Sequence, residues 1–246
     1  MDTTRDQTQS KSKSPAMTET RGLLVSLYSL TFVTGLVDAV SFLGLGHVFT
    51  ANMTGNVVFL GFAVAGAPGL SIPRSLVSLI AFLIGSAVGG RIGVAMAVKN
   101  RRRWLLAVAG IETVLLLVAA IVSAGFNIES GTPLRQLYVV IILTALAMGV
   151  RNATVRRLAV PDMTTTVLTL TLTGLAADSS FAGGSNTRLG RRTASVLLMF
   201  LGAASGALLL RWGASLPLAL SCICMLVTAM GYTALRTTDQ PTEGVR

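Results

Sequence analysis

Charged residues are scarce in this chain, and acidic ones are scarcer still. Only 12% of the 246 residues are charged, with 10 Asp and Glu against 20 Lys and Arg. Soluble domains carry about twice that charged fraction, and a soluble helical core of this size needs helices with one charged face. Such faces are missing here, and 52% of the residues are hydrophobic, with a mean hydropathy of +0.71. The shortage of charge therefore excludes a large soluble core and predicts an integral membrane protein.

Three kinds of functional site are missing from the sequence: metal sites, catalytic motifs and nucleic-acid-binding surfaces. The two cysteines, Cys222 and Cys224, are too close for an unstrained disulfide and too few for a metal site, so we expect no metal and no cofactor. Nucleophile elbows, phosphate-binding glycine loops and clustered catalytic carboxylates are lacking, so we do not expect an enzyme. The net charge of +10 sits in short clusters between apolar runs, without a basic helix face. Such clusters are typical of cytoplasmic loops and contact with anionic lipid, not of nucleic-acid binding.

Apolar segments long enough to cross a bilayer of about 30 Å dominate the rest of the chain. Eight of them are apparent, at about 22–43, 48–67, 76–98, 104–124, 134–150, 164–182, 194–213 and 214–235. The composition divides the chain into five parts: a disordered cytoplasmic tail (1–21), a first membrane repeat (22–126), a connecting loop (127–133), a second membrane repeat (134–235) and a C-terminal tail (236–246). The fold class is an all-α polytopic membrane protein.

The positions of Lys and Arg favour one topology over another. If all eight segments span, the two sides receive eight and eleven basic residues, which decides nothing. If segments two and six are broken or re-entrant and return to the side they entered, the counts become sixteen and three. Because basic residues concentrate in cytoplasmic loops, the second arrangement is favoured, with both termini cytoplasmic. It has six full spans in two inverted halves; eight full spans is the alternative.

Two similar patterns about 114 residues apart indicate an internal repeat. Gly35-Leu-Val-Asp38-Ala39 resembles Gly149-Val-Arg-Asn152-Ala153, and a Thr-rich stretch begins twelve residues after each polar residue. A second match pairs a glycine ladder in each half at an offset of 117, and it comprises Gly85, Gly89 and Gly93 in the first half and Gly202 and Gly206 in the second. Such ladders let membrane helices pack closely, and they also offer a surface for forming a homodimer.

Asp38 is the leading candidate for a functional group. A carboxylate inside an apolar span is costly unless it faces the protein interior or a wet cavity, and polar breaks repeated in two halves are typical of transporter sites. The candidate solute or ion pathway comprises Asp38, Thr50, Asn52, Thr54, Asn56, Asn152, Thr164, Thr165, Thr166 and Thr169. The alternatives are that Asp38 caps the broken segment beside it and that the hydroxyl groups bond back to their own helices.

Arg91 and Glu112 form a second constellation. They lie seven and eight residues inward from the ends of consecutive segments, on either side of the basic turn at 99–103. At 1.5 Å per residue both lie roughly 10–12 Å from that interface. The matching depth predicts a buried ion pair with a structural role, because pairing makes two costly charges tolerable.

The whole motif at 35–56, from Gly35 through Asp38 to Asn56, resembles the YoaK-like family of bacterial multi-pass membrane proteins, which carry a domain of unknown function. The segments at 147–153 and 164–169 are similar to the same family pattern, although Arg151 stands where a glutamine-like residue is expected. The resemblance covers about residues 23–235 and implies a location in the bacterial inner membrane. It implies no activity and no substrate.

The sequence therefore predicts a small-solute or ion transporter or channel, whose partners are the lipid bilayer and that solute or ion. Asp38 would be the charged group, and the threonine and asparagine side chains would line the path. The alternative is a non-transporting membrane scaffold that binds a partner protein. An intramembrane enzyme is the third and weakest hypothesis, because no catalytic set converges.

Overall fold

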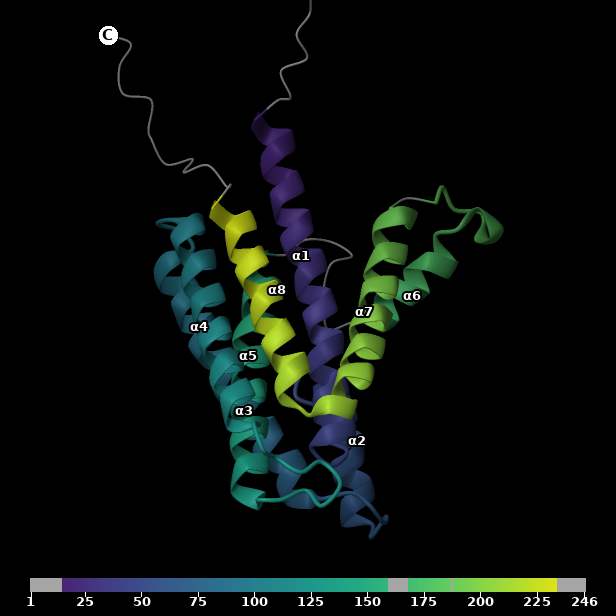
Figure 1. Ribbon diagram of the computed structural model, residues 1–246. Helices are drawn as coiled ribbons and strands as arrows, with labels where there is room; N and C mark the ends of the chain where they lie inside the picture. Colours follow the sequence, from purple (N-terminus) through teal and green to yellow (C-terminus); the bar gives the residue numbers. More distant parts are fainter. Residues whose placement is uncertain (1–14, 159–167, 187, 234–246) are drawn as a thin grey trace, which may run out of the picture.

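The computed structural model describes residues 15–158, 168–186 and 188–233, and these residues form a helical bundle without β-strands (Figure 1). Its eight α-helices are α1 (Pro15–Ala39), α2 (Met53–Val64), α3 (Ile72–Met96), α4 (Arg101–Val122), α5 (Leu134–Leu158), α6 (Leu168–Ala177), α7 (Leu189–Leu209) and α8 (Ser215–Thr233). Short turns of other helix types follow three of them, namely η1 (Val40–Gly44), η2 (Ser180–Ala182) and η3 (Leu210–Trp212). The predicted all-α class is confirmed.

Six of the described helices are long and apolar enough to cross a membrane, while α2 and α6 are short apolar helices. In the orientation of Figure 1, α1 ends and α3 begins at the lower end of the bundle, so the segment that contains α2 returns to the end it left. Likewise α5 ends and α7 begins at the upper end, on either side of α6. The described helices therefore have the favoured arrangement of six long apolar helices and two short ones in returning segments.

Helices from the two halves interleave rather than forming two separate bundles. The most extensive contacts pair α3 with α5 and α1 with α7, and α4 and α8 pack on each other and on α5 and α1. The most buried of the spanning helices are α1 and α5, at the centre of the bundle, whereas α3 and α7 are the most exposed. The buried core joins residues of both halves, among them Leu30, Leu105, Ile141 and Leu218. Each half therefore completes its packing only against the other.

Glycines set the closest of these contacts, and they do so in both halves. A Cβ at Gly85 would meet the main chain of Leu146, and a Cβ at Gly202 would meet the main chain of Phe32. Gly89, Gly93 and Gly206 lie on the same packed faces. The glycine ladders thus lie in contacts between helices of the same chain. Because these faces are occupied, they are not available for a homodimer.

Two helix boundaries differ from the sequence predictions. The first helix begins at Pro15, inside the stretch 1–21 expected to be a disordered tail, because an apolar span already nucleated can extend into flanking polar residues. The segment expected to end at 150 continues to Leu158 as α5. Arg151 and Asn152 are consequently helical residues inside the bundle, and not part of a loop.

Candidate functional site

The first helix ends abruptly a short way beyond Asp38. Its last α-helical residue is Ala39, and the chain then makes one π-helical turn, η1, which often marks a functional position. Gly46 and His47 have positive φ values of 82° and 59°, which turn the chain back into the bundle. The left-handed conformation at position 46 suits glycine, and a Cβ there would also collide with the Arg74 guanidinium.

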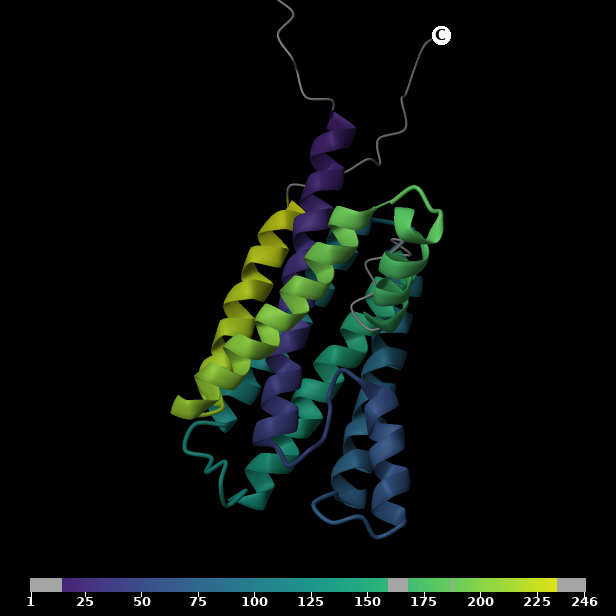
Figure 2. The same cartoon turned by 90° about the vertical axis from the view of Figure 1, so that its right-hand side faces the viewer.

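The segment 45–52 rises from the lower end of α1 to the start of α2, part-way up the bundle (Figure 2). Asn56 holds this segment in place and is fully buried. Its Oδ1 accepts from the Phe49 N–H at 2.8 Å, while its Nδ2 donates to the Phe49 carbonyl and to Ser78 on α3. Asn52 caps α2, since its side chain accepts from the Gly55 N–H. Asn56 is therefore a structural clamp rather than a ligand.

Asp38 lies inside the bundle and is 8% exposed. It is six residues from the end of its span at Gly44, or about 9 Å at 1.5 Å per residue. The backbone N–H of Ala51 interacts with its carboxyl group. Its Oδ1 is buried and has no hydrogen-bond partner among the described residues. The nearby Thr50 hydroxyl is likewise buried and without such a partner in the described chain.

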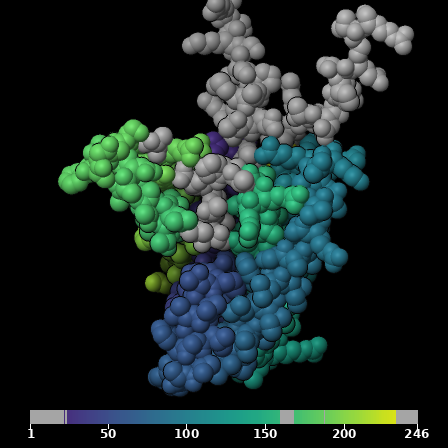
Figure 3. All heavy atoms as spheres, turned by 180° about the vertical axis from the view of Figure 1, so that it is seen from behind, coloured from purple at the N-terminus to yellow at the C-terminus, as the bar shows by residue number. Residues whose placement is uncertain are grey.

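A cavity of about 480 Å³ adjoins Asp38 and joins the two broken segments. Its described lining comes from α1, the start of α2, the start of the described part of α6, and α7, and it consists of Thr34, Asp38, Ala51, Asn52, Thr54, Gly55, Val58, Phe59, Leu168, Thr169 and Met199. Figure 3 shows residues of α6 above those of α2 on the same face of the molecule. Four predicted pathway residues, Asp38, Asn52, Thr54 and Thr169, thus share one space.

Thr50, Asn56 and Asn152 are not among the residues that line this cavity. Asn152 bonds back to the Met148 carbonyl of its own helix at 2.8 Å and does not line the cavity, so it is not equivalent to Asp38. Thr164, Thr165 and Thr166 lie outside the described residues.

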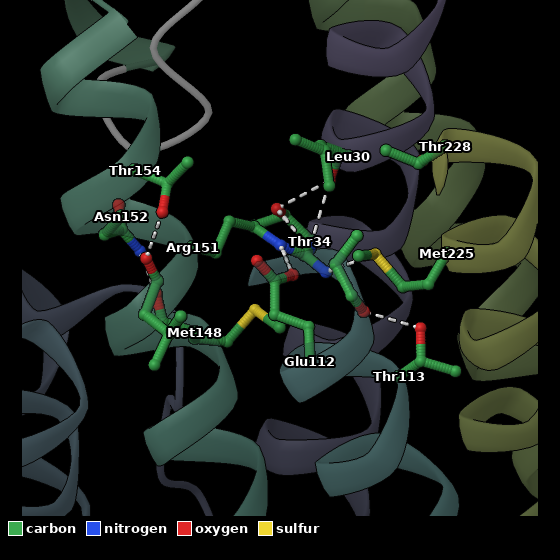
Figure 4. Close-up of polar contacts among 12 residues, drawn as sticks. Leu30, Thr34, Glu112, Thr113, Met148, Arg151, Asn152, Thr154, Met225 and Thr228 are labelled. Carbon is green, nitrogen blue, oxygen red and sulfur yellow. Dashed lines mark hydrogen bonds and ion pairs between the residues drawn. The ribbon is translucent and has the colours of Figure 1, made fainter. Parts of the chain in front are cut away.

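The predicted ion pair between Arg91 and Glu112 is wrong. Glu112 is buried, and its Oε2 accepts from Arg151 Nε at 2.8 Å (Figure 4). Arg91 is instead exposed on α3. The physical reason is helix packing, because α4 lies against α5 and α8 and has few contacts with α3. Equal depth on consecutive helices does not make two side chains face each other.

Arg151 is completely buried and fully engaged. Besides Glu112 it donates from Nη1 to the Leu30 carbonyl at 3.3 Å and to the Thr34 hydroxyl at 3.4 Å, and from Nη2 to Met225 Sδ at 3.1 Å (Figure 4). The sequence already indicated a buried polar role for Arg151, since this residue interrupts a largely apolar helix. The sequence also indicated that Thr34 lies beside the site, because it is one helical turn before Asp38 and hence on the same face.

The site contains no metal centre in the described part of the chain, where no three His, Cys, Asp or Glu side chains lie close enough to hold an ion. The two cysteines are free. What the cavity offers is a single carboxylate, three hydroxyl groups and an amide against an apolar wall. That chemistry suits non-covalent binding of a small solute.

Comparison with known proteins places the chain in a family. Residues 26–231 match the family described as "Protein of unknown function (DUF1275)". The chain is also 33% identical over 160 residues to the UPF0700 transmembrane protein YoaK of Bacillus subtilis (strain 168). These matched residues make up 65% of this chain and 68% of that protein. No solved structure is similar to it. The chain therefore belongs to the DUF1275 family and is a multi-pass membrane protein.

Proposed function

We propose that this protein moves a small solute or ion across the membrane, without covalent chemistry, through the cavity beside Asp38. The observation that carries the proposal is the convergence of a buried carboxylate with the broken segments of both halves on one cavity. Non-helical backbone within a membrane is tolerated where it is buried in protein or lines a cavity. Binding sites of many transporters are built from discontinuous helices in this way.

The two halves are proposed to be inverted structural repeats. In support, a Cβ at Gly35 would collide with Met199 and Gly202, and a Cβ at Gly149 would collide with Phe82 and Gly85. The partners in these two contacts are related by the same offsets of 114 and 117 residues that relate the sequence motifs. Each half contributes three spans and one returning helix. Inverted repeats of this kind allow one site to face each side in turn.

The upper end of the bundle is proposed to be cytoplasmic, in a bacterial inner membrane. Basic residues at that end are Lys99, Arg101, Arg102, Arg103, Arg156, Arg157, Arg188, Arg191 and Arg192. The lower end has Arg74, Arg135 and Arg211. This asymmetry follows the positive-inside rule. It puts α1's first described residues and the end of α8 on the cytoplasmic side.

Flux through reconstituted protein tests the proposal. Proteoliposomes with the wild-type chain are expected to take up at least one member of a panel of alkali cations, amines, amino acids and sugars faster than protein-free liposomes. Asp38→Asn should abolish that uptake, because it keeps the shape of the side chain but removes its charge. Glu129→Gln is the matched control, since Glu129 is an exposed carboxylate in the loop between α4 and α5.

Transport would be refuted if no solute of the panel were taken up and if cells that carry Asp38→Asn behaved like cells that carry the wild-type protein. Under that outcome the scaffold hypothesis takes its place, and a stoichiometric partner that binds Asp38→Asn as well as wild type would support it.

A further inference from the structure

One buried charged group in this bundle has no ion-pair partner among the described residues. Arg151 is a buried cation, and its Nε is committed to Glu112 at 2.8 Å. Asp38 is a second buried carboxyl, and no ion pair with it is found within the described residues. The other buried cation, Arg192, is paired with Asp178, so an ionised Asp38 would be the uncompensated charge among the described buried residues. A lone charge at this depth is costly and is normally compensated by a partner.

No other charged side chain on the neighbouring elements compensates Asp38. Five of their charged or titratable groups are engaged elsewhere: Arg151 on α5, which reaches the cavity through Thr34; Arg192 on α7, paired with Asp178; Arg74 on α3, on the Gly46 carbonyl; His47, against the Phe42 ring; and Tyr232 on α8, beside Glu112. Others among the described residues, such as Tyr28 on α1, Arg91 on α3, Arg191 on α7 and Cys222 and Cys224 on α8, do not line the cavity. Asp38 alone among them lines the cavity. Its compensating charge must therefore come from outside the described protein.

The cavity selects what that charge can be. A bare alkali cation needs several oxygen ligands, whereas a large part of the wall is apolar, with Val58, Phe59, Leu168 and Met199. A volume of about 480 Å³ holds a molecule rather than a bare ion. Phe59, an aromatic ring among the lining residues, also favours an organic cation over a neutral solute of the same shape. When no organic cation is bound, a proton can neutralise the Asp38 carboxylate.

We propose that Asp38 binds a proton and the cationic group of a small organic ammonium solute in alternation, so that each displaces the other. When the solute enters, the carboxyl proton leaves to the aqueous phase and the carboxylate pairs with the cationic nitrogen. When the solute leaves, a proton returns and the site is again neutral. The inference rests on the proposed transport function. If the site opens to each side of the membrane in turn, alternate binding of solute and proton at Asp38 exchanges the solute for a proton.

Chemical labelling of the wild-type, full-length protein tests this occupancy without a flux assay. Dicyclohexylcarbodiimide reacts with protonated carboxyl groups in apolar surroundings, and mass spectrometry identifies the modified residue. Asp38 is expected to be labelled, and labelling should fall as the pH rises because the carboxylate does not react. Choline and tetraethylammonium at saturating concentration should each reduce labelling about tenfold, as mass action requires when nine-tenths of the sites are filled.

The controls isolate charge from shape. Dimethylbutanol, the uncharged carbon isostere of choline, and Na⁺ should leave labelling unchanged. Asp38→Asn should lose the label, while Glu129→Gln should keep it. Failure to label Asp38 at any pH overturns protonation of the site. Labelling that choline and tetraethylammonium do not reduce, or that dimethylbutanol or Na⁺ reduces equally, overturns the organic cation.

Failure of this inference can be told apart from failure of transport. Flux of a neutral solute with no cation protection of Asp38 would retain transport and overturn the inference. Protection by choline without flux of any solute would retain the binding site and overturn transport.

Discussion

Arg151 reaches from α5 to Thr34 on α1, where its Nη1 lies 3.4 Å from the Thr34 hydroxyl. Thr34 also lines the cavity, one helical turn from Asp38. One hydroxyl group therefore connects the buried ion pair of the bundle to the candidate binding site. The ion pair lies between helices of both halves, so it also ties the second half of the chain to the first.

Removing one member of the ion pair should be strongly destabilising. Glu112→Gln and Arg151→Gln each leave an uncompensated buried charge, which costs about 3–5 kcal/mol. The double variant should recover much of that loss, because glutamine pairs can hydrogen bond without charge. Thermal unfolding in detergent micelles across the double-mutant cycle measures the coupling.

Arg91→Gln is the control for this cycle, since Arg91 is exposed on α3. It should change stability less than Glu112→Gln or Arg151→Gln does, because Arg91 is not packed in the protein interior. A coupling between Glu112 and Arg91 as large as that between Glu112 and Arg151 would contradict the observed pairing.

The close helix contacts can be tested with two glycines five residues apart on α3. A Cβ at Gly85 would overlap the Leu146 main chain, whereas a Cβ at Gly90 would meet nothing within 4 Å. Gly85→Ala should therefore destabilise the protein by about 1–3 kcal/mol through overpacking. Gly90→Ala should be neutral or stabilise by up to about 1 kcal/mol through helix propensity. Equal melting temperatures for the two variants would show that α3 does not pack on α5 at this point.

Asn56 should matter more for the fold than for recognition. Asn56→Ala leaves the Phe49 N–H without its partner, at a cost of about 1–3 kcal/mol, and removes the amide that bridges the Phe49 carbonyl and the Ser78 hydroxyl, which still bond to each other. Asn52→Ala removes only an exposed helix cap, worth about 1 kcal/mol. Unfolding measurements on both variants check the order, and a larger loss for Asn52→Ala would contradict the role of Asn56 as clamp.

The returning segments predict opposite sides for two loops. In a cysteine-free background, Pro68→Cys lies at the lower end and Ser185→Cys at the upper end of the bundle. A membrane-impermeant maleimide added to intact cells should label the cysteine at 68 and should reach the one at 185 only after the membrane is opened. Labelling of both from one side would instead indicate eight full spans.

The sequence by itself determined the membrane class, the six spans and the two breaks. These are local properties, since the length and polarity of a segment decide whether lipid can surround it. The charge asymmetry and the polar residues at 50–56 already indicated that the second segment does not cross. Asp38 was identified for the same reason, because a carboxylate in an apolar run is informative without knowledge of its neighbours.

Only the tertiary structure decided which buried groups meet. Hydropathy gives the depth of a side chain but not the direction in which it points or the helix it faces. Glu112 pairs with Arg151 rather than Arg91 because α4 packs on α5 and α8 of the second half and only slightly on α3, the helix before it in the sequence. Asn56 turned out to bind backbone, and Thr34 to line the cavity, because their roles depend on the path of the chain between α1 and α2.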